Sequence, residues 1–316
     1  MHTGGGPPAW GRVSRAEGRS RSLAPAEHAA AREFVRRVRE RVPAELVRAF
    51  LFGSKARSEA RPDSDVDILL IFRRLPPDRE PQAEMAEEIA GEVAAESGIP
   101  VTVWSVSLVD LAPGNRTPML VDALDDGIPL WPVGAPPVRV EFGPRDALRC
   151  VGALLQRVHE GGEEVSHLLR RGDAGAARRR IRDDLVRLCT AGLLLRGETR
   201  PRRGEAVRRF LACHGDEVPG RFNPVLRWAA RSYGPSGRDD EGAVGPPPGG
   251  AGEVADLIDG LRRWVCRQAR ALAERAEARE PARGARDRNR SRNSSPSRLP
   301  AMGNGGARRN PFTGLR

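Results

Sequence analysis

Two apolar runs separated by a short polar segment constrain the fold of this chain most strongly. Residues 46–52 read LVRAFLF, and residues 66–72 read VDILLIF. A continuous apolar run of this length is typical of a strand that is buried on both faces. The segment between the two runs contains Gly, Ser and Pro, which favour turns. We therefore expect two strands joined by a turn over residues 53–64.

The surrounding sequence predicts a small α/β domain over residues 25–133. Apolar residues at helical spacing predict a helix over 26–42, which Pro43 ends, and an acidic amphipathic helix over 80–97. A third strand is expected over 100–106. A short helix over 116–126 and a last strand over 128–131 complete this domain, for which we expect a small mixed sheet covered by helices.

The second half of the chain has a helical pattern throughout. A Pro/Gly-rich linker over 134–144 precedes it, and helices are predicted between residues 145 and 280. Within this region, residues 234–252 are rich in Gly and Pro and predict a flexible loop. The fold class is therefore an α/β domain followed by an all-α bundle. Helices are expected over 145–159, 163–171, 174–196, 204–214, 222–233 and 253–279.

The positive charge of the chain lies at its two ends. The net charge is +11, of which residues 1–24 contribute +3 from four Arg and one Glu, and residues 281–316 contribute +8 from nine Arg and one Asp. Both ends lack apolar periodicity and are predicted to be disordered. Residues 25–280 are therefore neutral overall. Contact with nucleic acid is expected only through the basic tail, by way of phosphates.

Other bulk features exclude several classes of protein. No apolar run approaches the roughly 18–20 residues that cross a membrane, and the N-terminus has no apolar signal region. The sequence thus predicts a cytoplasmic protein without membrane contact. The cysteines are far apart and form no metal-binding spacing, so buried free thiols are expected rather than a zinc site. They are Cys150, Cys189, Cys213 and Cys266.

Two aspartates at the start of the second strand predict a metal site. Asp65 and Asp67 flank Val66, and alternate residues of a strand face the same side, so the two carboxylates should project together. Neighbouring carboxylates repel each other unless a cation lies between them. Mg²⁺ held by one or two carboxylates and by substrate phosphates is the expected occupant.

The turn between the strands has the composition of a phosphate-binding loop. Gly53 and Ser54 follow directly on the first strand, where a backbone without a bulky side chain can approach a phosphate. Lys55, which is the only lysine in the chain, and Arg57 lie in the same loop and could neutralise phosphate charge.

This segment resembles the minimal nucleotidyltransferases (MNT) of the DNA polymerase β-like nucleotidyltransferase superfamily. Their signature is GSxARG, a short spacer and SDxDL. Here it reads GSKARS over Gly53–Ser58 and SDVDI over Ser64–Ile68, and the sequence DDGIPL over 125–130 is similar to the end of that domain. The resemblance covers residues 30–133.

The resemblance implies an enzyme that moves a nucleotidyl group, AMP if the donor is ATP, from a nucleoside triphosphate to a hydroxyl of an acceptor protein or small molecule, with Mg²⁺. It implies that Asp65 and Asp67 are catalytic and hold the metal. The implied nucleotide-binding residues are Gly53, Ser54, Lys55, Arg57 and Ser64.

The chain departs from the family pattern at two places. Ser58 stands where a Gly is common. Active members also carry a third carboxylate on the third strand, but residues 100–106 read PVTVWSV, with Thr102 near the expected position. Asp110 is the nearest acid downstream and lies beyond the strand. Losing a general base ordinarily slows a reaction about 10²–10⁴-fold, so nucleotide binding should persist while transfer is slow or lost.

The helical half resembles HEPN domains in its layout over residues 193–210. Active HEPN ribonucleases use Arg-x4–6-His, and Arg209 and His214 have this spacing. Residues i and i+5 lie about 140° apart on a helix, and Asp216 stands where a target tyrosine of the MNT enzymes would be. We therefore expect no independent ribonuclease.

Two other functions fit the same sequence. Aminoglycoside nucleotidyltransferases share the GS…DxD core and a helical C-terminal domain. A degenerate transferase that only binds nucleotide, or that acts in a toxin–antitoxin contact, would explain the missing third acid, although the intact Asp65 and Asp67 argue against it.

Overall fold

The structure is a computed structural model that describes residues 23–61, 63–75, 80–136, 138–199, 205–232 and 246–293. The chain divides into two compact units, residues 1–276 and 277–316; of the second, only the end of the last helix, up to residue 293, is described. Residues 1–22, 294–316 and 233–245 lie outside the described residues, and with them most of the predicted disordered ends and flexible loop.

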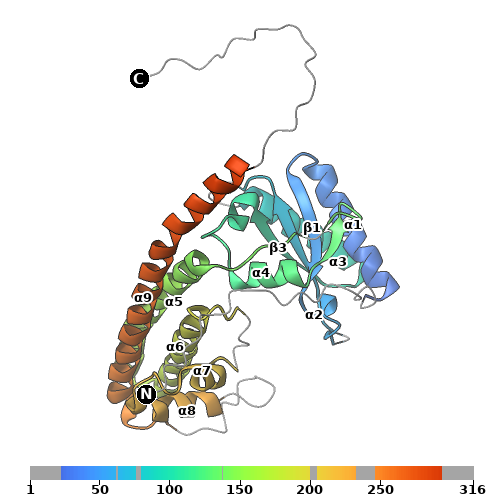
Figure 1. Ribbon diagram of the computed structural model, residues 1–316. Helices are drawn as coiled ribbons and strands as arrows, with labels where there is room; N and C mark the ends of the chain where they lie inside the picture. Colours follow the sequence, from blue (N-terminus) through green and yellow to red (C-terminus); the bar gives the residue numbers. More distant parts are fainter. Residues whose placement is uncertain are drawn as a thin grey trace, which may run out of the picture. The chain divides into compact units, whose positions relative to one another are not determined.

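The predicted α/β domain is present as a mixed four-stranded sheet (Figure 1). The strand order is β3-β2-β1-β4; β1 pairs antiparallel with β2 and with β4, whereas β2 and β3 are parallel. This confirms the small mixed sheet expected from the sequence. The strands are β1 (Leu46–Phe52), β2 (Val66–Phe72), β3 (Val101–Ser107) and β4 (Ile128–Trp131).

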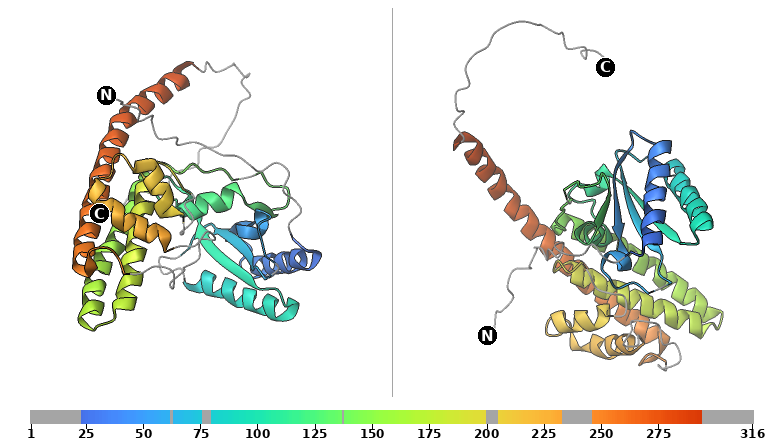
Figure 2. Two further views of the ribbon diagram at one scale, coloured as in Figure 1. Left: turned by 90° about the horizontal axis from the view of Figure 1, so that it is seen from below. Right: turned by 90° about the vertical axis from the view of Figure 1, so that its right-hand side faces the viewer.

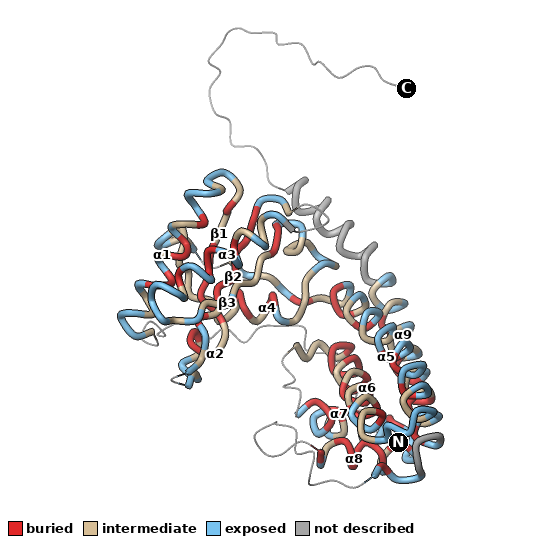
Figure 3. Tube along the Cα trace, turned by 180° about the vertical axis from the view of Figure 1, so that it is seen from behind, coloured by how far each residue is buried: buried red, intermediate tan, exposed pale blue. Residues whose placement is uncertain are grey.

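Helices cover both faces of this sheet. Helices α1 (Pro25–Arg41) and α3 (Glu80–Ser97) lie side by side on one face (Figure 2), where Phe34 and Ile89 are part of the apolar core. Helix α4 (Pro118–Asp125) packs on the opposite face. The alternating side chains of β2 enter both cores, which explains its continuous apolar sequence. Buried residues therefore follow the central strands (Figure 3).

The second half of the chain is helical, as predicted, and has an apolar core of its own. The helices predicted over 145–159 and 163–171 are one continuous helix, α5, which runs through Gly161 without a break. A Cβ atom on Gly161 would lie 2.2 Å from Oδ2 of Asp184, so glycine allows α5 and α6 to approach closely. The helices are α5 (Pro144–Arg170), α6 (Ala174–Leu194), α7 (Ala206–His214), α8 (Asn223–Arg231) and α9 (Gly250–Asn293), with short 3-10 helices η1 (Leu108–Leu111) and η2 (Gly220–Phe222).

The last helix is longer than the sequence predicted. The apolar pattern predicted an end at residue 279, and α9 spans Gly250–Asn293. None of the helices among the described residues is long and apolar enough to cross a membrane.

A buried carboxylate connects the α/β domain to the helical part. Oδ1 of Asp146, in the first turn of α5, accepts hydrogen bonds from the backbone N–H groups of Gly114 and Arg116 at 2.6 and 3.0 Å. Oδ2 accepts from the N–H of Gly143 at 2.9 Å. A buried carboxylate must be hydrogen-bonded. The bonds from Gly114 and Arg116 hold the start of α5 against the segment that precedes α4, and the bond from Gly143 caps α5 itself.

Candidate active site

The phosphate-binding loop predicted from the sequence follows β1 as the short helix α2 (Gly53–Ala56). Gly53 has a φ of +74°, a conformation that favours glycine, and a Cβ atom on it would lie 2.1 Å from Oδ2 of Asp67. The loop is closed by backbone bonds, including one from Glu59 N–H to the carbonyl of Ser54 at 2.9 Å. Gly53 is thus required both by its backbone conformation and by the carboxylate that lies against it.

Ser58, at the end of the loop, has a backbone conformation that favours glycine. Ser58 has a φ of +59° and is the one non-glycine residue with positive φ among those described. The left-handed conformation costs a non-glycine residue about 1–2 kcal/mol. Serine keeps the loop shape here at a cost that glycine would avoid.

The two predicted metal ligands lie together at the loop end of the sheet. Asp67 is opposite Phe52 of β1 and Thr102 of β3 in the strand register. Asp65 directly precedes β2, and its Oδ2 accepts a hydrogen bond from Oγ1 of Thr102 at 3.0 Å. Asp65 is exposed, and Asp67 is half-buried between the loop and β3. The structure therefore brings Gly53, Asp65 and Asp67 to one place.

The electrostatics of this pair suit a bound cation. Burial, together with the neighbouring charge of Asp65, raises the pKa of Asp67 above its usual range, and the opposing influence of Arg57 and Lys55 does not cancel the increase. A divalent cation would relieve both effects. Among the described residues, no group of three or more His, Cys, Asp or Glu could hold a metal. The pair fits a cation that completes its shell with phosphate oxygens and water.

The other predicted nucleotide-binding residues are placed differently. Lys55 is only 3% exposed, and its Nζ lies 2.5 Å from Oε1 of Glu27 in α1. Arg57 is half-buried and its Nε pairs with Oε2 of Glu59 at 3.0 Å. Oγ of Ser64 accepts from the N–H of Arg61 at 2.9 Å, which closes the turn before β2. Glu27 was not predicted to take part in the site, because in the sequence it is only an acid in the first turn of an expected helix.

Thr102 stands where the third carboxylate was expected, and Asp110 is the nearest acid downstream. Thr102 lies beside Asp67 in the register and contacts Asp65, so β3 does present a hydroxyl where an acid was expected. Asp110 lies beyond the other end of β3. Its Oδ2 accepts from the N–H and Oγ of Ser107 at 2.8 and 2.9 Å, and it therefore caps η1.

The Arg209/His214 pair of the helical part does not form a shared site. His214 is 4% exposed, its Nε2 lies 3.2 Å from the carbonyl of Gly192, and its ring packs against Trp264 with centroids 5.4 Å apart. Arg209 is exposed and its Nη2 pairs with Glu198 at 2.8 Å. The histidine is part of the apolar core and the arginine is on the surface, as expected for opposite sides of a helix.

We expect His214→Ala to destabilise the protein by about 2–4 kcal/mol, because it removes a packed ring and leaves polar partners unsatisfied. Urea unfolding measures this change. The wild type should leave a fluorescent RNA intact. RNA cleavage that disappears in the folded His214→Ala variant would contradict this assignment.

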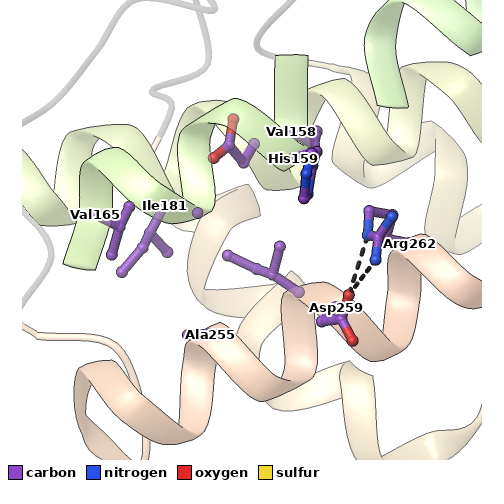
Figure 4. A pocket seen from close by; sticks show the side chains of 10 residues that line it. Val158, His159, Val165, Ile181, Ala255, Asp259 and Arg262 are labelled. Carbon is purple, nitrogen blue, oxygen red and sulfur yellow. Dashed lines mark hydrogen bonds and ion pairs between the residues drawn. The ribbon is translucent and has the colours of Figure 1, made fainter. Parts of the chain in front are cut away.

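The helical part contains a small cavity that includes neither Asp65 nor Asp67 (Figure 4). It has a volume of about 100 Å³ and is lined by residues of α5, α6 and α9, including His159, Asp184 and Asp259. Its acidic groups already have cationic partners, because Asp184 pairs with Arg187 at 2.6 Å and Asp259 pairs with Arg262 at 2.7 Å. The charged groups at this cavity are thus neutralised within the helical part.

Asp67→Asn is expected to stabilise the metal-free protein at neutral pH by no more than about 1 kcal/mol, because solvent screens the half-buried carboxylate. The folded-state pKa of Asp67 is raised, so its ionisation opposes folding once the pH exceeds the usual Asp range. The advantage of the variant should be absent below that range, should grow as the pH rises from the usual Asp pKa to the raised pKa of Asp67, and should stay constant above it. Thermal unfolding in chelator at several pH values tests this; a variant less stable than the wild type at pH 7 would contradict it.

Comparison with known proteins finds a family match over part of the chain. Residues 31–122 match the family model of the nucleotidyltransferase domain. This match spans less than a third of the sequence and contains the loop, both aspartates and β3. A search of curated proteins gives no match to the chain. The family match supports placing the α/β domain in the nucleotidyltransferase superfamily, whose general chemistry is nucleotidyl transfer.

Proposed function

We propose that this protein is a Mg²⁺-dependent nucleotidyltransferase that transfers AMP from ATP, or the equivalent group from another nucleoside triphosphate, to a hydroxyl of a protein or small molecule. The observation that carries the proposal is the contact between the loop and the carboxylates. A Cβ atom on Gly53 would lie 2.1 Å from Oδ2 of Asp67, so the backbone at the start of the loop packs directly against a carboxylate that we assign to the metal.

Each residue of the site has a role in this proposal. Gly53 and Ser54 would receive the triphosphate, because successive backbone N–H groups in such a turn can donate hydrogen bonds to phosphate oxygens. Asp65 and Asp67 would hold Mg²⁺. The ion supplies charge neutralisation at the phosphates. In the overall reaction the bond between the α- and β-phosphates breaks, the acceptor oxygen bonds to the α-phosphate, and pyrophosphate and a proton leave.

Thr102 determines how fast this enzyme would be. Its hydroxyl is a hydrogen-bond donor to Asp65, and a threonine neither binds a second metal as a carboxylate does nor accepts a proton at neutral pH. We therefore propose a site that binds nucleotide well and transfers it slowly. The same observation favours a second candidate, a nucleotide-binding module that has lost transfer and acts through contacts of the toxin–antitoxin type.

The HEPN-like character of the helical part stays a prediction. The layout of α5 to α9 is helical, as that resemblance requires, and the burial of His214 argues against ribonuclease activity in it. In this proposal the helical part serves partner or acceptor binding.

The test is incubation of the full chain with Mg²⁺ and ATP labelled at either the α- or the γ-phosphate, with the protein itself and purified candidate proteins as acceptors. The proposal expects covalent α-label with matching pyrophosphate release, and no γ-label. Calorimetry on the same sample distinguishes the second candidate, which binds ATP without transfer. The absence of both binding and transfer with each of the four common nucleoside triphosphates would overturn the proposal.

A further inference from the structure

A buried ion pair connects helix α1 to the phosphate-binding loop. Lys55 is the third residue of α2, and its side chain is 3% exposed. Its Nζ lies 2.5 Å from Oε1 of Glu27, which is itself 18% exposed. An ammonium group is rarely buried without strong compensation, because its desolvation is costly. The chain places its only lysine at this position.

Glu27 is held firmly for this contact. Its other oxygen, Oε2, accepts a hydrogen bond from the N–H of Ala24 at 2.8 Å, at the N-terminus of α1. The positive end of the helix dipole favours an anion there. Burial acts to raise the pKa of Glu27, but the hydrogen bonds from Lys55 and Ala24 outweigh it, so the pKa lies below its usual range. The carboxylate is thus charged and fixed at neutral pH.

The loop is held by contacts at Gly53, Lys55 and Ala56, and Ala56 is buried in the apolar core that includes residues of α1. Gly53 lies against the carboxylate of Asp67, and Lys55, two residues later, reaches to α1. α2 has only four residues, Gly53–Ala56, and so short a helix has little stability of its own. Its position therefore depends on these tertiary contacts.

We propose that Glu27 is a positioning residue of the nucleotidyl-transfer site: through Lys55 it fixes the loop backbone at Gly53 and Ser54 in the arrangement that receives the triphosphate. The inference rests on the function proposed above. An apolar pair would fill the same volume with a smaller desolvation cost, whereas the ion pair defines one direction and one distance between α1 and the loop. A purely structural pair would affect stability and leave nucleotide affinity unchanged in the folded protein.

The experiment compares the wild type with Glu27→Gln, Lys55→Met and Lys55→Arg in the full chain, below the unfolding temperature of every variant. Glu33→Gln is the matched control. Glu33 is in the same helix as Glu27 and also forms ion pairs, but its partners are Arg36 and Arg37 of that helix and not the loop. Hydrogen exchange without nucleotide measures how fast the backbone amides of residues 53–58 exchange with solvent. Calorimetry with ATP and Mg²⁺ reports affinity.

Glu27→Gln and Lys55→Met should accelerate exchange of the loop amides and weaken ATP binding at least about tenfold, since misplaced binding groups cost up to roughly 10²-fold. Lys55→Arg should retain most of the affinity, and Glu33→Gln should match the wild type. Unchanged loop exchange in Glu27→Gln would overturn the proposal, as would faster exchange with wild-type ATP affinity. If the wild type binds no nucleotide, the proposed function fails, and the exchange measurement still decides whether Glu27 orders the loop.

Discussion

Replacing Asp65 and Asp67 together by alanine is expected to abolish the binding of ATP with Mg²⁺. The two carboxylates lie side by side at the loop end of β2, and the described residues offer no third carboxylate, cysteine or histidine to make a metal-binding group. Metal-mediated stabilisation of phosphate charge amounts to several kcal/mol, so the affinity should fall by roughly 10²–10³-fold or more. Isothermal titration calorimetry with ATP, in Mg²⁺ and in chelator, measures the loss.

Asp63→Ala is the matched control for this experiment. Asp63 is exposed in the same turn, two residues before Asp65, and its removal changes the local charge by the same amount as either single replacement. It should bind like the wild type. The double variant should stay folded, because the partly buried carboxylate of Asp67 opposes folding at neutral pH. Equal binding by the double variant and the wild type would show that the site is elsewhere.

Thr102→Asp is expected to increase nucleotidyl transfer by about 10²–10⁴-fold, the usual contribution of a general base. The register places Thr102 beside Asp67, and its hydroxyl lies 3.0 Å from Oδ2 of Asp65, so a carboxylate there would join the existing pair. The measurement is the rate of α-label transfer from ATP at saturating nucleotide. ATP affinity should change much less than the rate, because binding already depends on Asp65 and Asp67.

The controls follow from the strand geometry. Thr102→Asn has nearly the same shape without the charge and should leave the rate low. Val103→Asp places the acid one residue later, where the side chain packs into the core on the opposite face of the sheet, with α1 and α3. It should destabilise the fold without accelerating transfer. Rapid transfer by the wild type, or a Thr102→Asp variant as slow as wild type, would exclude the role of Thr102 as a substitute for the missing acid.

The sequence alone determined the local parts of this site. The run VDILLIF predicted a strand buried on both faces, and β2 has its side chains in both cores. The spacing of Asp65 and Asp67 predicted two carboxylates on one side, because the period of a strand is fixed by its backbone. Gly53 at a strand end predicted a backbone that a phosphate can approach, and this stays a prediction; the contact of Gly53 with Asp67 gives a second reason for glycine that the sequence did not indicate.

The tertiary structure decided what depends on partners distant in the chain. Local sequence gives the period of β3, but only its parallel pairing with β2 placed Thr102, rather than Val101 or Val103, beside Asp67. Lys55 was predicted to contact phosphate because it is a cation in a loop, and this stays a prediction; its contact with Glu27, 28 residues away, could not be predicted from the local sequence. His214 likewise became a core residue through its packing against Trp264 of α9. Periodicity describes one element at a time, whereas burial and pairing are set by the neighbours that folding brings together.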